Sequence, residues 1–128
     1  MKDLKITAIE DDIDVIDFIK YALETLGVDF SFDTISNGSE FKSRFPFLES
    51  DLVVLDLMMP GITGFEICGY IRKNPKLVKT KVLAITGYDT PENKMKILNS
   101  GADDYLAKPF ELRDLVSKLQ TLISDIEK

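Results

Sequence analysis

The chain has 128 residues, which fits one domain with a sizeable core of its own. Its 16 Lys and Arg residues against 22 Asp and Glu residues give a net charge of −6. That charge argues against direct nucleic-acid binding, because neutralised phosphates supply most of such affinity. The sequence contains no histidine, which excludes histidine catalysis, and its one cysteine, Cys68, excludes an internal disulfide. With no signal-peptide pattern and no apolar run long enough to cross a bilayer, we expect a cytoplasmic protein without membrane contact.

Apolar strands and amphipathic helices alternate along the chain. Short apolar runs predict five strands, over residues 4–9, 29–36, 51–56, 81–86 and 104–107. Apolar residues at helical spacing predict five helices, over residues 15–26, 38–45, 64–75, 91–101 and 112–126. Stop signals support several of these ends, among them Gly27, Pro75 and Gly101. The pattern therefore consists of five strand–helix units.

Such alternation, with unbroken apolar strands over 51–56 and 81–86, favours a parallel sheet covered by helices on both faces. We predict an α/β fold, a single doubly wound (βα)5 domain over residues 1–128. Its five-stranded parallel sheet is expected to have the common order 2-1-3-4-5, which makes the first and third strands neighbours. No linker, low-complexity segment or second domain is expected.

Polar residues gather where the predicted strands end. In open α/β sheets, ligands bind beyond the carboxyl ends of the strands. The residues found at these ends are Glu10, Asp11, Asp12, Asp56, Thr86 and Lys108. We expect the side chains of Glu10, Asp11 and Asp56 to converge, because the strands that lead to them are adjacent in the predicted order.

Convergent carboxylates repel one another, by roughly 4 kcal/mol for two charges ~4 Å apart at an effective dielectric of ~20. A domain that tolerates them usually protonates one acid or binds a cation. Because the chain lacks histidine, the predicted ligand is a hard divalent cation held by oxygen, Mg²⁺ first and Mn²⁺ as a possibility. Beside that cation, Asp56 could act as a nucleophile toward a phosphoryl group, with Lys108 and Thr86 binding the phosphoryl oxygens.

Each of these residues also has a simpler interpretation. Single Asp residues at strand ends are commonly turn or helix-cap residues, and we assign that role to at least one of Asp12 and Asp14. Taken alone, Thr86 fits a structural role and Lys108 fits an exposed side chain. The functional interpretation gains weight because all of these residues fall at one edge of one sheet.

Four segments together resemble the receiver domain of two-component response regulators. They are "ITAIEDD", "VVLDLMMPGITGFE", "VLAITG" and "GADDYLAKPF", in the order of that family. Asp56 lies 30 residues before Thr86 and 52 before Lys108, as the family's pattern requires. The resemblance covers essentially the whole chain, and it implies the flavodoxin-like form of the doubly wound fold.

The resemblance implies a role for each residue of the predicted site. Asp56 is expected to accept a phosphoryl group from the phosphohistidine of a sensor histidine kinase or a phosphotransfer protein. Glu10, Asp11 and Asp56 are expected to bind Mg²⁺, together with the backbone carbonyl of Met58. Lys108 is expected to pair with the phosphoryl oxygens.

The resemblance also implies a switch. Thr86 is expected to move toward the phosphoryl group, and the ring of Tyr105 to turn inward. The surface formed by the helix over 91–101, the strand over 104–107 and the last helix then changes, and it binds a downstream partner, an effector domain or a second copy. The Lys108–Pro109 peptide bond is a candidate for the cis form.

Two residues depart from the commonest family pattern: Glu10 replaces the more usual Asp, and Thr63 stands where an Asp is frequent. The sequence ends in "SKLQTLISDIEK" without a linker or output region. The expectation is therefore either a single-domain regulator or a receiver cut from a longer protein.

The favoured function is a signalling module that is phosphorylated and is not an enzyme toward other substrates. Three other functions are alternatives to it. A Mg²⁺-dependent phosphatase of the haloacid-dehalogenase type would use an aspartyl phosphate, but its second acid is replaced here by Met58. A degenerate receiver could serve as an unphosphorylated scaffold, although the site residues are complete. A nucleotide-binding flavodoxin-like protein is disfavoured because no Gly-rich loop follows the first strand.

Overall fold

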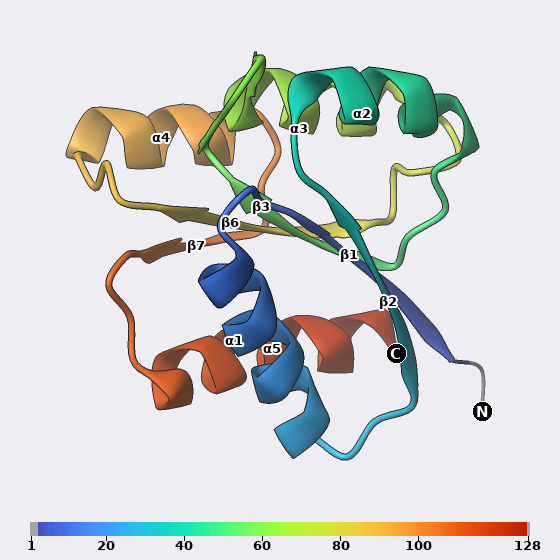
Figure 1. Ribbon diagram of the computed structural model, residues 1–128, viewed down its shortest axis with the longest axis vertical. Coiled ribbons are helices and arrows are strands. Elements are labelled where there is room, and N and C mark those ends of the chain that lie inside the picture. Colours follow the sequence, from blue (N-terminus) through green and yellow to red (C-terminus); the bar gives the residue numbers. More distant parts are fainter. Residues whose placement is uncertain (1–2, 128) are drawn as a thin grey trace.

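The structure, a computed structural model, describes residues 3–127 and has the alternating architecture expected from the sequence (Figure 1). The main sheet contains five strands: β1 (Leu4–Ile9), β2 (Phe30–Ile35), β3 (Leu52–Asp56), β6 (Lys81–Thr86) and β7 (Asp104–Ala107). The helices are α1 (Ile13–Thr25), α2 (Gly38–Arg44), α3 (Gly64–Lys73), α4 (Pro91–Asn99) and α5 (Leu112–Ile126). A 3₁₀ helix, η1 (Phe45–Phe47), follows α2.

The sheet has the order β2-β1-β3-β6-β7, and all its pairings are parallel. This confirms the predicted order 2-1-3-4-5, counted over the strands of the main sheet. A short antiparallel hairpin, β4 (Met58–Met59) and β5 (Ile62–Thr63), stands apart from that sheet. Within residues 3–127, none of the helices combines the length and the apolar character that crossing a membrane requires.

Helices cover both faces of the sheet, with α1 and α5 on one side and α2, α3 and α4 on the other (Figure 1). Successive strand residues point to opposite faces, so Val54 packs toward α1 and α5 whereas Val53 and Leu55 pack toward the other three helices. The first core includes Ile6, Ala8, Ile19, Leu23, Leu83, Ile85, Leu115 and Leu119. The second includes Phe41, Ile67, Ile71, Val82, Ala84 and Ile97. The unbroken apolar strands are thus explained by burial on both faces.

The helix ends follow local chemistry. Asp12 caps α1 by accepting a hydrogen bond from the Asp14 N–H at 2.9 Å, so one of the two predicted capping aspartates has that role. Thr63 and Glu66 form a capping box at the start of α3, which gives Thr63 a structural function of its own. The predicted 64–75 helix ends at Lys73, and Asn74 is its C-cap.

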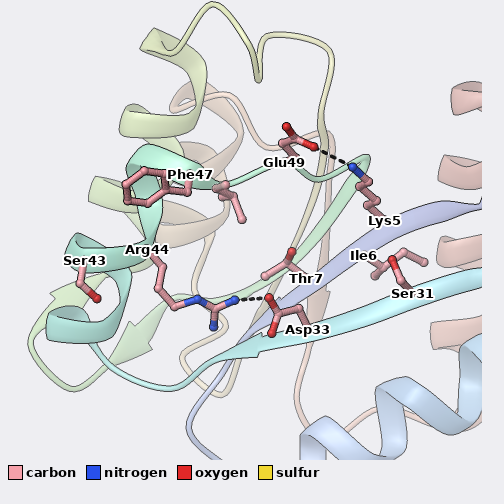
Figure 2. Close-up of a pocket in the computed structure, with 10 residues that line it drawn as sticks. Lys5, Ile6, Thr7, Ser31, Asp33, Ser43, Arg44, Phe47 and Glu49 are labelled. Atoms are coloured by element: carbon pink, nitrogen blue, oxygen red, sulfur yellow. Dashed lines mark hydrogen bonds and ion pairs between the residues drawn. The ribbon is translucent and has the colours of Figure 1, made fainter.

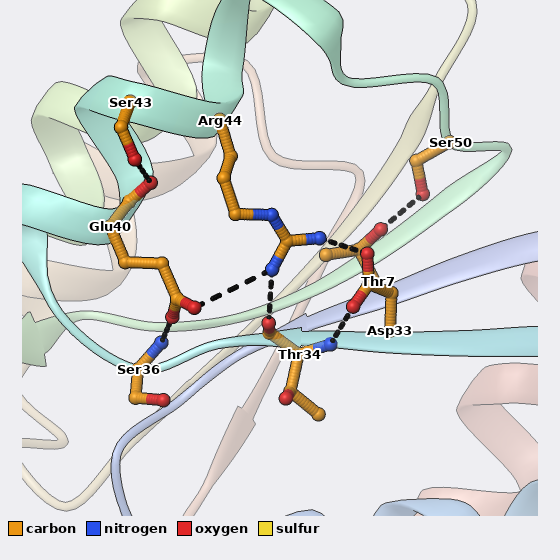
Figure 3. A network of polar contacts seen from close by, with 8 residues as sticks. All are labelled: Thr7, Asp33, Thr34, Ser36, Glu40, Ser43, Arg44 and Ser50. Atoms are coloured by element: carbon orange, nitrogen blue, oxygen red, sulfur yellow. Dashed lines mark hydrogen bonds and ion pairs between the residues drawn. The ribbon is translucent and has the colours of Figure 1, made fainter.

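The edge strand β2 is covered by a polar network that starts from α2 (Figure 3). Arg44 donates to the Thr34 carbonyl at 2.6 Å and forms an ion pair with Asp33. Asp33 accepts from the Thr34 N–H at 2.9 Å, and Glu40 accepts from the Ser36 N–H at 2.6 Å. Side chains thereby occupy backbone groups that an exposed sheet edge would otherwise offer to another strand.

Candidate functional site

The carboxyl edge of the sheet brings the predicted residues to one place. The loops that follow β1, β3, β6 and β7 all leave the sheet at this edge (Figure 1). Glu10 and Lys108 come directly after β1 and β7, and Asp56 and Thr86 are the last residues of β3 and β6. Because β1 pairs with β3, the acids that follow the first strand lie beside Asp56.

Three carboxylates converge at this edge. Glu10, Asp11 and Asp56 each place an oxygen atom within 4.8 Å of the other two. Glu10 is fully buried and Asp56 nearly so, whereas Asp11 is exposed. The cluster therefore has a buried floor and one side that solvent can reach.

Lys108 reaches into the same cluster from the end of β7. Its ammonium nitrogen lies 2.9 Å from Glu10 Oε1 and 3.6 Å from Asp56 Oδ2. Burial lowers the pKa of Lys108, but the hydrogen bond to Glu10 and the negative charges of both acids outweigh burial and raise it overall. Lys108 is therefore a cation, and it neutralises part of the negative charge of the cluster. The peptide bond between Lys108 and Pro109 is cis.

The ionised form of Glu10 is destabilised in this arrangement. Its burial, reinforced by the hydrogen bond and charge of Asp56, raises its pKa to about 7 against the lowering effect of Lys108. Its Oε2 atom accepts from the backbone N–H groups of Asp11 at 3.0 Å and Asp12 at 3.2 Å. Both carboxylate oxygens of Glu10 are thus held by donors, although the charge itself is poorly solvated.

The loop after Asp56 is closely packed. The Met58 N–H donates to Asp56 Oδ1 at 3.2 Å, and Met58 is half-exposed. At the tip of the β4–β5 hairpin, Gly61 has a φ of +87° and touches the start of α2. The Gly38 N–H donates to the Pro60 carbonyl at 2.8 Å, and a Cβ on Gly38 would lie 2.7 Å from the Gly61 carbonyl carbon. Glycine at position 38 is what permits this close approach.

Thr86 and Tyr105 make their hydrogen bonds to the loop that connects β6 with α4. The buried Thr86 hydroxyl accepts from the Tyr88 N–H at 2.9 Å. The Tyr105 hydroxyl donates to Asp89 Oδ1 at 3.0 Å. Burial, followed by the hydrogen bond and charge of Asp89, raises the pKa of Tyr105 to about 12. Tyr105 is therefore a neutral hydrogen-bond donor over the physiological pH range.

The donor set of the cluster suits a hard divalent cation. Octahedral Mg²⁺ with ligands at about 2.1 Å places neighbouring ligands roughly 3 Å apart and opposite ligands roughly 4.2 Å apart. Three carboxylate oxygens within 4.8 Å of one another are close to that requirement. All the donors are oxygen atoms, as Mg²⁺ prefers.

Two contacts of the site were not anticipated from the sequence. The sequence predicted that Lys108 pairs with phosphoryl oxygens and named no partner for it in their absence; here its ammonium nitrogen lies 2.9 Å from Glu10 and 3.6 Å from Asp56. Asp89 was not singled out at all, and its bond to Tyr105 depends on how β7 packs beside the β6–α4 loop. The weak signal available was a carboxylate three residues after the strand that ends in Thr86.

A separate hollow of about 480 Å³ lies on the α2 side of β1 and β2 (Figure 2). Lys5 lines it five residues before Glu10, roughly 16 Å away along the strand. Its two cations are already paired, Lys5 with Glu49 at 2.7 Å and Arg44 with Asp33. This hollow lies apart from the acidic cluster and offers a ligand no unpaired cation.

Comparison with known proteins identifies the class of protein that this fold and cluster define. The family model described as "Response regulator receiver domain" matches residues 6–120. The chain is 32% identical over 119 residues to the phosphate regulon transcriptional regulatory protein PhoB of Rhizobium meliloti (strain 1021), covering 93% of this chain and 52% of that protein. It is 38% identical over 120 residues to the transcriptional regulatory protein QseB of Haemophilus influenzae, covering 94% of this chain and 52% of that protein.

Solved structures agree with the family match. The crystal structure of the signal receiver domain of a DNA-binding response regulator (merR) from Colwellia psychrerythraea 34H superposes with a TM-score of 0.85. The two chains are 31% identical, and the match covers 95% of this chain and 99% of that one. The present chain belongs to the response regulator receiver domain family, whose members are phosphoryl-accepting signalling domains of two-component systems and bind Mg²⁺ at an acidic pocket. It spans about half the length of the curated relatives it matches.

Proposed function

We propose that residues 1–128 form one receiver domain in which Asp56 accepts a phosphoryl group from the phosphohistidine of a sensor histidine kinase or a phosphotransfer protein. A carboxylate oxygen of Asp56 attacks the phosphorus atom, the phosphorus–nitrogen bond breaks, and the departing histidine nitrogen takes up a proton. The observation that carries the proposal is the convergence of Glu10, Asp11 and Asp56 beside Lys108. Phosphoryl transfer mainly needs positioning and charge neutralisation, and this cluster is built for both.

Glu10, Asp11, Asp56 and the backbone carbonyl of Met58 would hold Mg²⁺, and Mn²⁺ could take its place. When bound, the cation neutralises the carboxylates and the phosphoryl oxygens. Lys108 needs only a small movement to exchange its contact with Glu10 for a phosphoryl oxygen on Asp56, because its nitrogen is already 3.6 Å from Asp56 Oδ2. The hydroxyl proton of Thr86 is available to donate to the same group, since that hydroxyl acts as an acceptor toward Tyr88.

The output of the domain is a population shift of the surface formed by α4, β7 and α5, with Tyr105 as its switch residue. This surface would bind a downstream protein, an effector domain or a second phosphorylated copy. Transfer would occur in the cytoplasm, away from membranes. The domain would not bind nucleic acid directly, and it would catalyse only its own phosphorylation and dephosphorylation.

The test is a labelling experiment with intact-mass detection. Incubation with Mg²⁺ and acetyl phosphate is expected to add one phosphoryl group, stable in acid and labile in base. Asp56→Asn should abolish the addition. Asp51→Asn is the matched control, because Asp51 flanks the opposite end of β3 and should leave labelling intact.

The competing functions give different results in the same experiment. Continuous hydrolysis of many phosphate esters would indicate a phosphatase instead. No labelling at any Mg²⁺ concentration would indicate a scaffold. Labelling that persists in Asp56→Asn would show that another residue accepts the phosphoryl group.

A further inference from the structure

Tyr105 differs from the other tyrosines of the chain in its burial. Its side chain is 8% exposed, whereas Tyr21, Tyr70 and Tyr88 are 55%, 47% and 61% exposed. A buried phenol needs a hydrogen-bond partner for its hydroxyl group. Tyr105 finds that partner in the carboxylate of Asp89, 3.0 Å away on the β6–α4 loop.

The loop that carries Asp89 is short and held at both ends. At its start, the Tyr88 N–H donates to the Thr86 hydroxyl at 2.9 Å. At its end, Thr90 caps α4 by accepting from the Asn93 N–H at 3.1 Å. The Asp89–Tyr105 bond joins the middle of this loop to β7. One side-chain contact therefore connects the segment after Thr86, the start of α4 and the strand that carries Tyr105.

The Asp89 side chain is exposed, so its contact with Tyr105 does not follow from burial of Asp89 in the core. The contact joins a phenol hydroxyl donor to a carboxylate oxygen, which can only accept from it, at an ordinary hydrogen-bond distance of 3.0 Å. The core cluster to which Tyr105 belongs consists of apolar side chains such as Ile97 and Ala102.

We propose that Asp89 is a positioning residue whose carboxylate holds the Tyr105 ring in its buried position. It thereby biases the α4–β7–α5 surface toward the state that the buried ring defines. The regulatory part of this inference rests on the proposed function, since it assumes that this surface is the output of the domain. The other part of the inference, that Asp89 holds the Tyr105 ring in its buried position, does not depend on the proposed function.

The ring position can be measured with ¹³C-labelled tyrosine and a soluble gadolinium chelate, which broadens the NMR signals of exposed rings. Tyr105→Phe assigns the signal, and in the unmodified protein that signal should be protected while the other three are broadened. Asp89→Ala should raise the ratio of exposed to buried Tyr105 ring about fivefold, the size expected for losing one partly solvated hydrogen bond. Asp89→Asn should change the ratio less than about twofold, because its amide oxygen can still accept.

Glu92→Ala is the matched control, since Glu92 is an exposed acid in the first turn of α4 and should leave the Tyr105 signal unchanged. Equal protection of Tyr105 in Asp89→Ala and in the unmodified protein would overturn the proposal. So would an equal loss of protection in Asp89→Ala and Asp89→Asn, because rescue by the conservative variant is what separates a specific bond from general loosening.

A second measurement addresses regulation. The rates of Asp56 labelling by acetyl phosphate should change by the same factor in Asp89→Ala, Tyr105→Phe and the double variant, because all three remove one bond. Multiplying effects in the double variant would refute a shared contact. If the unmodified protein takes up no phosphoryl group, the proposed function fails, while the ring measurement still decides the role of Asp89.

Discussion

Replacing Glu10 by Gln should remove a pH-dependent cost to the stability of the domain, although Glu10 is fully buried and bonded to Lys108. The folded chain raises the pKa of Glu10 from its ordinary 4.5 to about 7, chiefly through burial. At 1.36 kcal/mol for each pKa unit, that difference corresponds to about 3 kcal/mol of folding free energy. A glutamine has no proton to lose in this range, so the variant escapes this cost.

The direction of the pH dependence follows from proton binding. Between pH 4.5 and about 7, Glu10 is protonated in the folded chain and ionised in the unfolded chain. The folded state binds more protons there, so the stability of the unmodified protein falls as pH rises through this window. The full cost is present above about pH 7 and vanishes below pH 4.5. The chain contains no histidine, so no such side chain obscures the effect.

Urea unfolding with a chelator present, followed by tyrosine fluorescence, measures this effect, because the chain has four tyrosines and no tryptophan. The free energy of unfolding of Glu10→Gln relative to that of the unmodified protein should rise by about 3 kcal/mol between pH 4.5 and pH 8. With an m-value of about 1.5 kcal/mol/M, the midpoint of the variant should shift by about 2 M relative to that of the unmodified protein. Glu92→Gln, at an exposed position of α4, should show no such change. A difference in stability between Glu10→Gln and the unmodified protein that is the same at both pH values would refute the assignment of the effect to Glu10 ionisation.

Two further variants test the loop and the cation site. Gly38→Ala should lower the free energy of unfolding by about 2 kcal/mol, because the new Cβ would lie 2.7 Å from the Gly61 carbonyl carbon. Gly69→Ala should raise the free energy of unfolding by about 0.5–1 kcal/mol, because Gly69 lies inside α3 with open space around it. Equal urea midpoints for the two variants would contradict this packing. Asp11→Asn should weaken Mg²⁺ binding roughly tenfold and reduce the Mg²⁺-dependent rise in Tm accordingly. An unchanged affinity in a Mg²⁺ titration would place the cation away from Asp11.

Much of the fold follows from periodicity and strand ends. Continuous apolar residues in β3 and β6 have one physical solution in a small domain, a sheet buried on both faces. Once strands of that kind are parallel, their carboxyl ends meet at one edge, which is why Glu10 and Asp56 were expected to lie together. The order β2-β1-β3-β6-β7 then makes β1 and β3 neighbours, as the site requires.

The features that the sequence did not predict depend on contacts between segments that are distant in the sequence, or on elements too short to show a pattern. The β4–β5 hairpin contains two residues in each strand, too few for any alternation to be visible. The contact of Gly38 with Gly61 joins segments that no local pattern relates. The choice of Lys108 between Glu10 and Asp56 is set by side-chain conformation and by the burial of each acid, neither of which a spacing rule contains.

The short strand β7 links the ionisation of Glu10 to the proposed switch, because it contains Tyr105 and is followed directly by Lys108, the partner of Glu10. A cation held by Glu10 would stabilise the charged form of that residue and reduce its dependence on Lys108. Lys108 would then be available to Asp56; it follows β7 directly, three residues after Tyr105. If Glu10 holds the cation as proposed, binding would recover the free energy that the folded chain loses by holding Glu10 ionised, and the carboxylate repulsion would then favour the cation-bound form. Exchange of partners by Lys108 would act on the end of the same strand that carries Tyr105 and its hydrogen bond to Asp89.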